Sequence, residues 1–220
     1  MTTFIVLRHA QSTANERGIL AGQLPGVHLT STGISEADSV VAALSGRKID
    51  RIFTSPLERC LETVEPLAAT RKLKVLTDDR LVEMNYGNWS GKKLKLLSIR
   101  PLWRTIQSAP SQVRFPGGES FLEMADRVKN LLDSLRRKFP NDSILLVTHG
   151  DITKFIATYF MELPLDHIQK FVVNPASLSI YHCKKEKMII ELFNGNQFPS
   201  TSELQQSTLG GETGSGNRRR

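Results

Sequence analysis

The chain has few cysteines, no long apolar run and no basic leader. Its 220 residues include only two cysteines, Cys60 and Cys183. Two cysteines without an export signal predict reduced thiols rather than a disulfide framework. No segment reaches the ~18 uncharged apolar residues that a membrane helix requires. The first eight residues lack the charged and cleavage regions of a signal peptide. These absences predict a cytoplasmic protein without a membrane partner.

The overall composition is that of a globular protein. Hydrophobic residues make up 40% and charged residues 23% of the chain, which excludes wholesale disorder. The length fits one domain best. The formal net charge of +7 suits an anionic ligand, but it suits ordinary solubility equally well.

The last residues differ from the rest of the chain. Residues 199–220 are rich in polar residues and offer only Leu204 and Leu209 for burial. Such a segment cannot compensate for its ordering entropy, so we expect a disordered tail after a single domain of residues 1–198. The three terminal arginines suit nucleic acid or lipid, but a solvated tail is the preferred interpretation and no nucleic-acid partner is expected.

Strand and helix patterns alternate along the body of the chain. Apolar runs predict strands at residues 4–7, 51–54, 74–77 and 143–148. Between and after them, apolar residues at helical spacing predict helices at residues 33–45, 57–67, 121–135 and 152–161. Thr32 and Ser120 are the expected N-terminal residues of two of these helices, and Pro66 is expected to kink or restart a third.

The final pattern is a hairpin of residues 177–182 and 188–193 around a charged turn. Together the elements predict a three-layer α/β/α sandwich with a mainly parallel sheet, in which the last strand is an antiparallel edge. Residues 85–118 do not fit the alternation, because they contain two tryptophans, three prolines and no strong strand. We expect them to form a small, mostly helical cap insertion.

Reactive side chains follow three of the predicted strands. Arg8 and His9 end the first strand, Arg59 comes shortly after the second, and His149 ends the strand at residues 143–148. In open α/β sheets ligands bind outside the carboxyl ends of the strands. Two arginines, two histidines and a helix N-terminus at one edge predict an oxyanion site, for which phosphate is the natural occupant.

Six sequence blocks in order resemble the histidine phosphatase superfamily, the phosphoglycerate mutase-like proteins. The resemblance covers about residues 3–193. The blocks are Leu7-Arg8-His9-Ala10-Gln11-Ser12 with Asn15; Gly22-Gln23 followed by Leu29-Thr30-Ser31-Thr32-Gly33; Ser55-Pro56-Leu57-Glu58-Arg59 with Thr63; Leu81-Val82-Glu83 followed by Tyr86-Gly87-Asn88-Trp89-Ser90-Gly91; Pro116-Gly117-Gly118-Glu119-Ser120; and Val147-Thr148-His149-Gly150-Asp151.

Two positions depart from the family pattern. Ala10 replaces the usual glycine, which is tolerable where the backbone φ stays negative. The stretch of residues 24–28 lacks the usual Asp and Pro before Leu-Thr, so His28 is a candidate substrate contact, although an exposed loop histidine is the preferred interpretation.

The residues and the resemblance agree on a reaction. His9 is the predicted nucleophile, and Arg8, Arg59 and His149 are expected to bind the phosphoryl oxygens. Glu83 follows two apolar residues and precedes Tyr86 and Trp89, so we expect a protonated carboxyl that acts as general acid and then as base. Further substrate contacts are predicted at Asn15, Gln23, Gly150, Asp151 and His28. No cofactor and no metal are expected.

The resemblance and the motifs favour a metal-independent phosphomonoester hydrolase that forms a phosphohistidine on a small phosphorylated substrate. A phosphomutase and a non-catalytic phosphate-binding module remain alternatives. The cap also carries basic residues that suit a multiply charged ester, although a solvated basic face is preferred. A monomer or a homodimer is expected, since the last strand is an edge that can pair between subunits.

Overall fold

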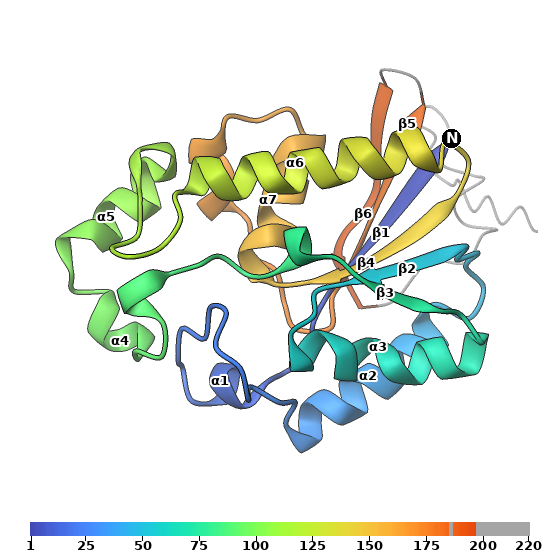
Figure 1. Cartoon of the computed structure of the whole chain (residues 1–220), viewed down its shortest axis with the longest axis horizontal. Coiled ribbons are helices and arrows are strands. Elements are labelled where there is room, and N and C mark those ends of the chain that lie inside the picture. Colours follow the sequence, from blue (N-terminus) through green and yellow to red (C-terminus); the bar gives the residue numbers. More distant parts are fainter. Residues whose placement is uncertain (185–186, 197–220) are drawn as a thin grey trace, which may run out of the picture.

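Six strands of the described chain form one mixed sheet (Figure 1). The computed structural model describes residues 1–184 and 187–196. Across the sheet the strand order is β3-β2-β4-β1-β5-β6. The strands are β1 Thr2–Arg8, β2 Arg51–Thr54, β3 Val75–Thr77, β4 Ser143–Thr148, β5 Leu178–Lys184 and β6 Lys187–Gly195. Strands β1 to β4 pair in parallel, whereas β5 is antiparallel to β1 and β6 is antiparallel to β5. The predicted mainly parallel sheet is confirmed.

Helices cover both faces of the sheet. Helices α2 and α3 pack together on one face, and α6 and α7 lie on the other (Figure 1). The helices are α1 Thr13–Glu16, α2 Ser31–Ala43, α3 Glu58–Arg71, α4 Leu94–Leu97, α5 Pro101–Ser108, α6 Phe121–Lys138 and α7 Gly150–Phe160. Short 3-10 helices occur at Asp79–Leu81, Gly87–Trp89, Pro110–Gln112 and Leu165–Lys170.

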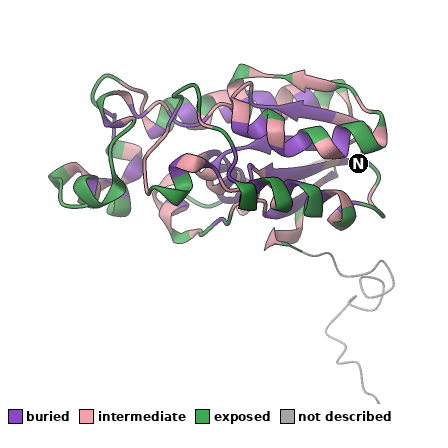
Figure 2. Cartoon of the chain, turned by 90° about the horizontal axis from the view of Figure 1, so that it is seen from below, coloured by how far each residue is buried: buried purple, intermediate pink, exposed green. Residues whose placement is uncertain are grey.

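The central strands are apolar along their whole length because both of their faces are covered. In β1, Phe4 and Val6 join the core beneath α6 and α7, whereas Ile5 and Leu7 join the core beneath α2 and α3. A strand covered by helices on both sides has no polar face, which produces continuous apolar runs rather than alternation. Buried residues accordingly occupy the strands, and exposed residues the outer sides of the helices (Figure 2).

The helices differ from the predictions in several details. Helix α2 begins earlier than expected, because Thr30 rather than Thr32 accepts a hydrogen bond from Gly33 N. Helix α7 begins at Gly150 directly after His149, and not at residue 152. Pro66 was expected to kink or restart a helix; the restart is wrong, since α3 continues through it, and the kink stays a prediction. Burial of Val64 and Leu67 against the sheet outweighs the one backbone hydrogen bond that proline removes.

The start of α6 agrees with its sequence signal. Ser120 is the N-cap residue, and its side chain and that of Glu123 form a reciprocal capping box.

Before α6 in the chain, α4 and α5 lie at one end of the sheet, away from the strands (Figure 1). The division into one domain with a cap insertion stays a prediction, and the predicted tail at residues 199–220 lies outside the described residues. Within the described part, no helix combines the length and apolarity needed to cross a bilayer.

We expect Gly33→Ala to destabilise the protein, because α2 begins in close contact with the loop after β1. A Cβ at Gly33 would lie 2.0 Å from the backbone oxygen of Gln11, so the backbone must move. Overpacking of this kind costs about 1–3 kcal/mol. Urea unfolding measures the loss, and Gly46→Ala is the control, since a Cβ there meets no atom within 4 Å. Equal stability of the two variants would contradict the close approach of α2 to residue 11.

Candidate active site

Strand register brings the two predicted histidines together. Because β1 and β4 are parallel and Arg8 pairs with Thr148, His9 and His149 leave neighbouring strand ends. The His9 backbone N–H donates to Thr148 O at 2.8 Å. The two rings meet edge to face, with centroids 5.2 Å apart. Strand β2 lies on the other side of β4 and leads into α3, which places Arg59 in its first turn.

The His9 ring is held as a neutral imidazole. Its Nδ1 lies 2.8 Å from the carbonyl oxygen of Ala10, which can only accept, so Nδ1 carries the proton and Nε2 keeps its lone pair. Burial lowers the pKa of His9 well below its usual range, and the charges of Arg8 and Arg59 lower it further. Ala10 is not among the residues with positive φ, so alanine is compatible with this backbone. His9 is therefore suited to act as a nucleophile.

The guanidinium groups of Arg8 and Arg59 lie near His9, and neither forms an ion pair with another described residue. Arg8 Nη1 donates to Val173 O at 2.6 Å, and Arg59 Nη2 donates to Gly22 O at 2.8 Å. Arg8 Nε and Arg59 Nη1 are buried and have no hydrogen-bond partner among the described residues. Arg59 is 1% exposed, yet no carboxylate of the described chain forms a salt bridge with it or with Arg8. Buried donors of this kind are stabilised by an anion that accepts from both.

His149 lies behind His9 rather than on the pocket wall. Its ring is fully buried, and it is absent from the residues that line the pocket. Its Nε2 lies 2.8 Å from Ser55 Oγ, and Cys60 Sγ lies 3.5 Å from the same nitrogen. Burial lowers the pKa of His149 well below its usual range, with Arg59 as the next contribution. The structure thus gives His149 a supporting position beside the nucleophile, and its predicted contact with a phosphoryl oxygen stays a prediction.

Glu83 supplies a carboxyl group with an unusual proton affinity. Burial raises the pKa of Glu83 from 4.5 to about 7, and the nearby charge of Asp151 raises it as well. The Met84 backbone N–H donates to Glu83 Oε1 at 3.0 Å, which opposes the shift. Glu83 lines the same pocket as Arg8, His9 and Arg59. A carboxyl of this pKa can both give and take a proton near neutrality.

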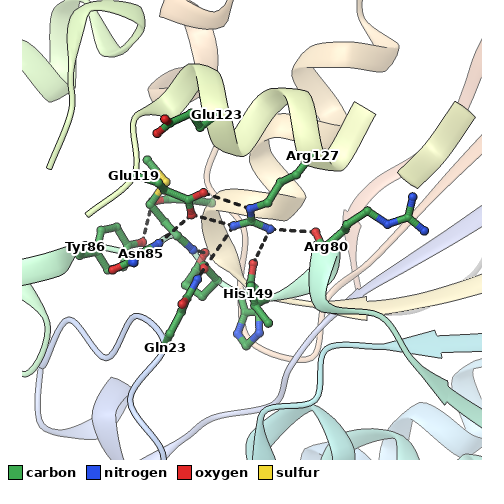
Figure 3. Close-up of polar contacts among 12 residues, drawn as sticks. Gln23, Arg80, Asn85, Tyr86, Glu119, Glu123, Arg127 and His149 are labelled. Atoms are coloured by element: carbon green, nitrogen blue, oxygen red, sulfur yellow. Dashed lines mark hydrogen bonds and ion pairs between the residues drawn. The ribbon is translucent and has the colours of Figure 1, made fainter. Parts of the chain in front are cut away.

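Arg127 of α6 fixes the backbone of the segment that carries Glu83 (Figure 3). Its Nη1 donates to the carbonyl oxygens of Arg80 and Val82 at 2.8 and 2.9 Å, and its Nη2 donates to that of Glu83 at 3.3 Å. The Glu119 carboxylate balances the charge by accepting from both Nη2 and Nε of Arg127. This arrangement holds the Glu83 backbone against α6.

Three of the five other predicted substrate contacts line the pocket. They are Asn15, Gly150 and Asp151. Asn15 Oδ1 accepts from Ser12 in the capping box of α1, which leaves its Nδ2 as the donor toward a ligand. Gly150 and Asp151 are the first two residues of α7.

Asp151 is tied into the pocket wall. It accepts a 2.7 Å hydrogen bond from the Tyr86 hydroxyl, and its other oxygen lies 3.3 Å from Lys154 Nζ. These contacts hold the carboxylate near Glu83, where its charge favours the protonated form of that residue.

The other two predicted substrate contacts lie elsewhere. Gln23 is exposed, and its Nε2 donates to the backbone oxygen of Glu83 at 2.8 Å, so it supports the acid residue (Figure 3). His28 is exposed and pairs with Glu62 of α3 outside the pocket. The loop of residues 24–28 turns outward there, which brings His28 to α3 and not to the phosphoryl end.

The pocket has a volume of about 470 Å³. The basic side chains of the cap are all exposed and do not line it. They are Lys92, Lys93, Lys95, Arg100, Arg104 and Arg114. Across residues 1–184 and 187–196, no group of three or more His, Cys, Asp or Glu side chains is arranged to hold a metal ion.

The sequence did not point to Arg127 or to the Tyr86–Asp151 hydrogen bond. Arg127 lies in an amphipathic helix, where an arginine is typical of the solvated face. Tyr86 and Asp151 are 65 residues apart, and only the fold brings them together. The Phe171–Val173 segment of the pocket wall has no sequence signature either.

Comparison with known proteins assigns the chain to a family. The model of the histidine phosphatase superfamily (branch 1) matches residues 4–196. Phosphoserine phosphatase 1 of Hydrogenobacter thermophilus is 29% identical over 196 residues, which cover 88% of this chain and 92% of that protein. The 2,3-bisphosphoglycerate-dependent phosphoglycerate mutase of Thermoplasma acidophilum is 25% identical over 191 residues, covering 82% and 86%. The structure of Entamoeba histolytica phosphoserine phosphatase with 3-phosphoglyceric acid has the same fold, with a TM-score of 0.81 and 24% identity over 89% of this chain and 98% of that one.

We expect Glu83→Gln to become more stable relative to the unsubstituted protein as pH rises. Folding raises the pKa of Glu83 from 4.5 to about 7, so the folded state binds this proton more tightly than the unfolded state. The carboxyl therefore costs stability as pH rises from about 4.5 to about 7, and glutamine removes this cost. Between pH 5 and pH 8 the variant should gain on the order of 2–3 kcal/mol, measured by urea unfolding. Exposed Glu16→Gln is the control. A stability difference that does not change with pH would refute the raised pKa.

Proposed function

The chain belongs to the histidine phosphatase superfamily (branch 1), and from this we propose that it hydrolyses phosphomonoesters through a phosphohistidine formed on His9. The observation that carries the proposal is the neutral imidazole of His9 beside two arginines, each with a buried N–H group that has no partner among the described residues. Such a site attracts a phosphoryl group and holds a nucleophile against it. The Hydrogenobacter relative is a phosphoserine phosphatase, which supports a phosphatase activity.

In the proposed first step, Arg8 and Arg59 bind the phosphoryl oxygens and orient the phosphorus toward His9 Nε2. The lone pair of Nε2 attacks phosphorus in line with the leaving oxygen, so one P–N bond forms as the P–O bond of the ester breaks. The hydrogen bond from Nδ1 to Ala10 O stabilises the positive charge that develops on the ring. Asn15 Nδ2 and the first amides of α7 supply further donors at the same end of the pocket.

Glu83 is the proposed proton carrier of both steps. The protonated carboxyl donates to the leaving alkoxide, which departs as an alcohol. The resulting carboxylate then removes a proton from water, and the hydroxide attacks the phosphohistidine to release inorganic phosphate and restore His9. A pKa of about 7 keeps both forms of Glu83 populated near neutrality. Asp151 and Arg127 act through Glu83, the first by charge and the second by position.

Two assays separate hydrolysis from the alternatives. The purified protein is offered 4-nitrophenyl phosphate in the presence of a chelator, and separately 3-phosphoglycerate with 2,3-bisphosphoglycerate. We expect release of inorganic phosphate from the aryl ester, which needs no metal in this scheme. Isomerisation without phosphate release would instead establish a phosphomutase, and binding without turnover a phosphate-binding module.

We expect His9→Ala to lower kcat/KM for 4-nitrophenyl phosphate by at least about 1000-fold, because no other described side chain replaces a nucleophile of the covalent route. Circular dichroism and the unfolding midpoint should show that the variant folds. His28→Ala is the matched control, since it removes a histidine that lies outside the pocket, and its turnover should stay within about twofold. Comparable turnover of His9→Ala and His28→Ala would rule out the nucleophile assignment.

We expect Glu83→Gln to slow esters of poor leaving groups more than esters of good ones. An alkoxide needs a proton to depart, whereas 4-nitrophenolate leaves without one, and general acid catalysis contributes roughly 100- to 10,000-fold. The rate of the phosphorylation step should therefore fall at least about 100-fold for ethyl phosphate and much less for 4-nitrophenyl phosphate. Pre-steady-state release of the alcohol measures this step directly. Equal losses for both esters would mean that Glu83 is not the general acid.

A further inference from the structure

The pocket has two chemically different ends. Arg8, His9 and Arg59 form the cationic end described above, and the remaining wall combines large apolar side chains with polar ones such as Gln107 and Gln169. That wall includes Leu20, Trp89, Trp103, Ile106, Phe115 and Phe171. Most of these side chains come from the cap, with α5 supplying Trp103 and Ile106, and from the segment after α7.

The aromatic part of this wall is packed into a fixed shape. Trp89 and Phe115 meet edge to face at 5.6 Å, and Phe115 meets Tyr86 in the same way at 5.0 Å. Trp103 lies nearly parallel to Trp89, with an interplanar angle of 13° and centroids 6.5 Å apart. Trp89 and Phe115 are buried by these contacts, whereas Trp103 is only partly buried. The wall is thus preformed, and Trp103 offers apolar surface to a ligand.

The wall holds no uncommitted cation for a second anionic group. Besides Arg8 and Arg59, the only lysine or arginine among the lining residues of the described chain is Lys154. Its Nζ lies 3.3 Å from Asp151 Oδ1 and 3.0 Å from Gln169 Oε1, and its side chain is 22% exposed. The basic side chains of the cap face solvent and do not reach the pocket. A carboxylate or second phosphate of a substrate would therefore find no uncommitted lysine or arginine in this wall to compensate its charge.

The size of the pocket fits a ligand larger than phosphate. Its volume of about 470 Å³ lies within the range of roughly 300–1,000 Å³ typical of small-molecule sites. At the mouth, Val172 and Leu94 are 70% and 38% exposed, so the apolar surface continues to the opening. An organic group attached to the phosphoryl oxygen would thus contact apolar side chains along its path to solvent.

We propose that this apolar wall is the subsite for the alcohol part of the substrate, and that the substrates are phosphomonoesters of uncharged, hydrophobic alcohols. The inference rests on the proposed function and specifies its substrate class. It separates this chain from an enzyme that selects phosphoserine or phosphoglycerate, because each of those carries a carboxylate next to the ester.

Four alkyl phosphates with alcohol leaving groups test the proposal: benzyl phosphate, ethyl phosphate, O-phosphoserine and 3-phosphoglycerate. A buried methylene contributes about fourfold to binding, so partial burial of the benzyl ring should raise kcat/KM at least tenfold over ethyl phosphate. Phosphoserine and 3-phosphoglycerate should fall below ethyl phosphate. If either of them exceeds benzyl phosphate, or if benzyl and ethyl phosphate are equal, the inference is overturned while hydrolysis stands. If the protein hydrolyses none of these four esters and does not hydrolyse 4-nitrophenyl phosphate either, the proposed function itself is overturned.

Two variants locate the effect in the wall. Trp103→Ala should lower kcat/KM for benzyl phosphate at least fivefold and for ethyl phosphate less than twofold, and exposed Lys92→Ala is the cap control that changes neither. Val172→Lys places a cation at the mouth at a site exposed enough to spare the fold. It should raise kcat/KM for phosphoserine relative to benzyl phosphate at least fivefold. The wall is not the subsite if both ratios of kcat/KM stay unchanged: that of benzyl to ethyl phosphate in Trp103→Ala, and that of phosphoserine to benzyl phosphate in Val172→Lys.

Discussion

Positive charge that is buried without a paired carboxylate is the constraint on which the site depends. Arg59 is almost fully buried, and Arg8 is tied to a backbone carbonyl, yet neither forms a salt bridge within the described residues. Water solvates these groups freely in the unfolded chain, so burying them on folding costs free energy. The packing of the sheet and its helices must offset that desolvation cost. Burial lowers the pKa of His9, and the charges of Arg8 and Arg59 lower it further, while the same charges prepare the pocket for an oxyanion. The two arginines thus contribute to both the nucleophile and anion binding.

Burial and nearby charges also determine the pKa of Glu83. Its carboxyl lies near two arginines, which lower its pKa, and near Asp151, which raises it. Desolvation is the largest contribution, and the balance leaves the pKa at about 7. Arg127 of α6, whose charge Glu119 balances, holds the Glu83 backbone, so position and proton affinity are set by different residues (Figure 3). Stability is lost where the proposed chemistry needs an ionisable group inside the protein.

The fold class could be predicted from the sequence because its strongest signals are local. The run at residues 143–148 coincides with β4, and Ser120 caps α6 as expected. The convergence of Arg8, His9, Arg59 and His149 followed from the rule that parallel strand ends share one edge of a sheet. Pro66 does not restart the helix, since its local cost is outweighed by tertiary packing of α3 that the sequence does not display. Three other features depend on contacts between segments that are remote in the sequence, which no local pattern encodes. They are the position of His149 behind His9, the pairing of His28 with Glu62, and the support from Arg127.

The central claim is that this cationic pocket transfers the phosphoryl group to the imidazole of His9. The most direct measurement is rapid mixing with a ³²P-labelled ester, quenching in alkali within the first turnover, and mapping of the labelled peptide. The account predicts a label that is stable in alkali, is released by mild acid and maps to the peptide that contains His9. A burst of alcohol release with no protein-bound label, or a label stable to acid on another peptide, would contradict it.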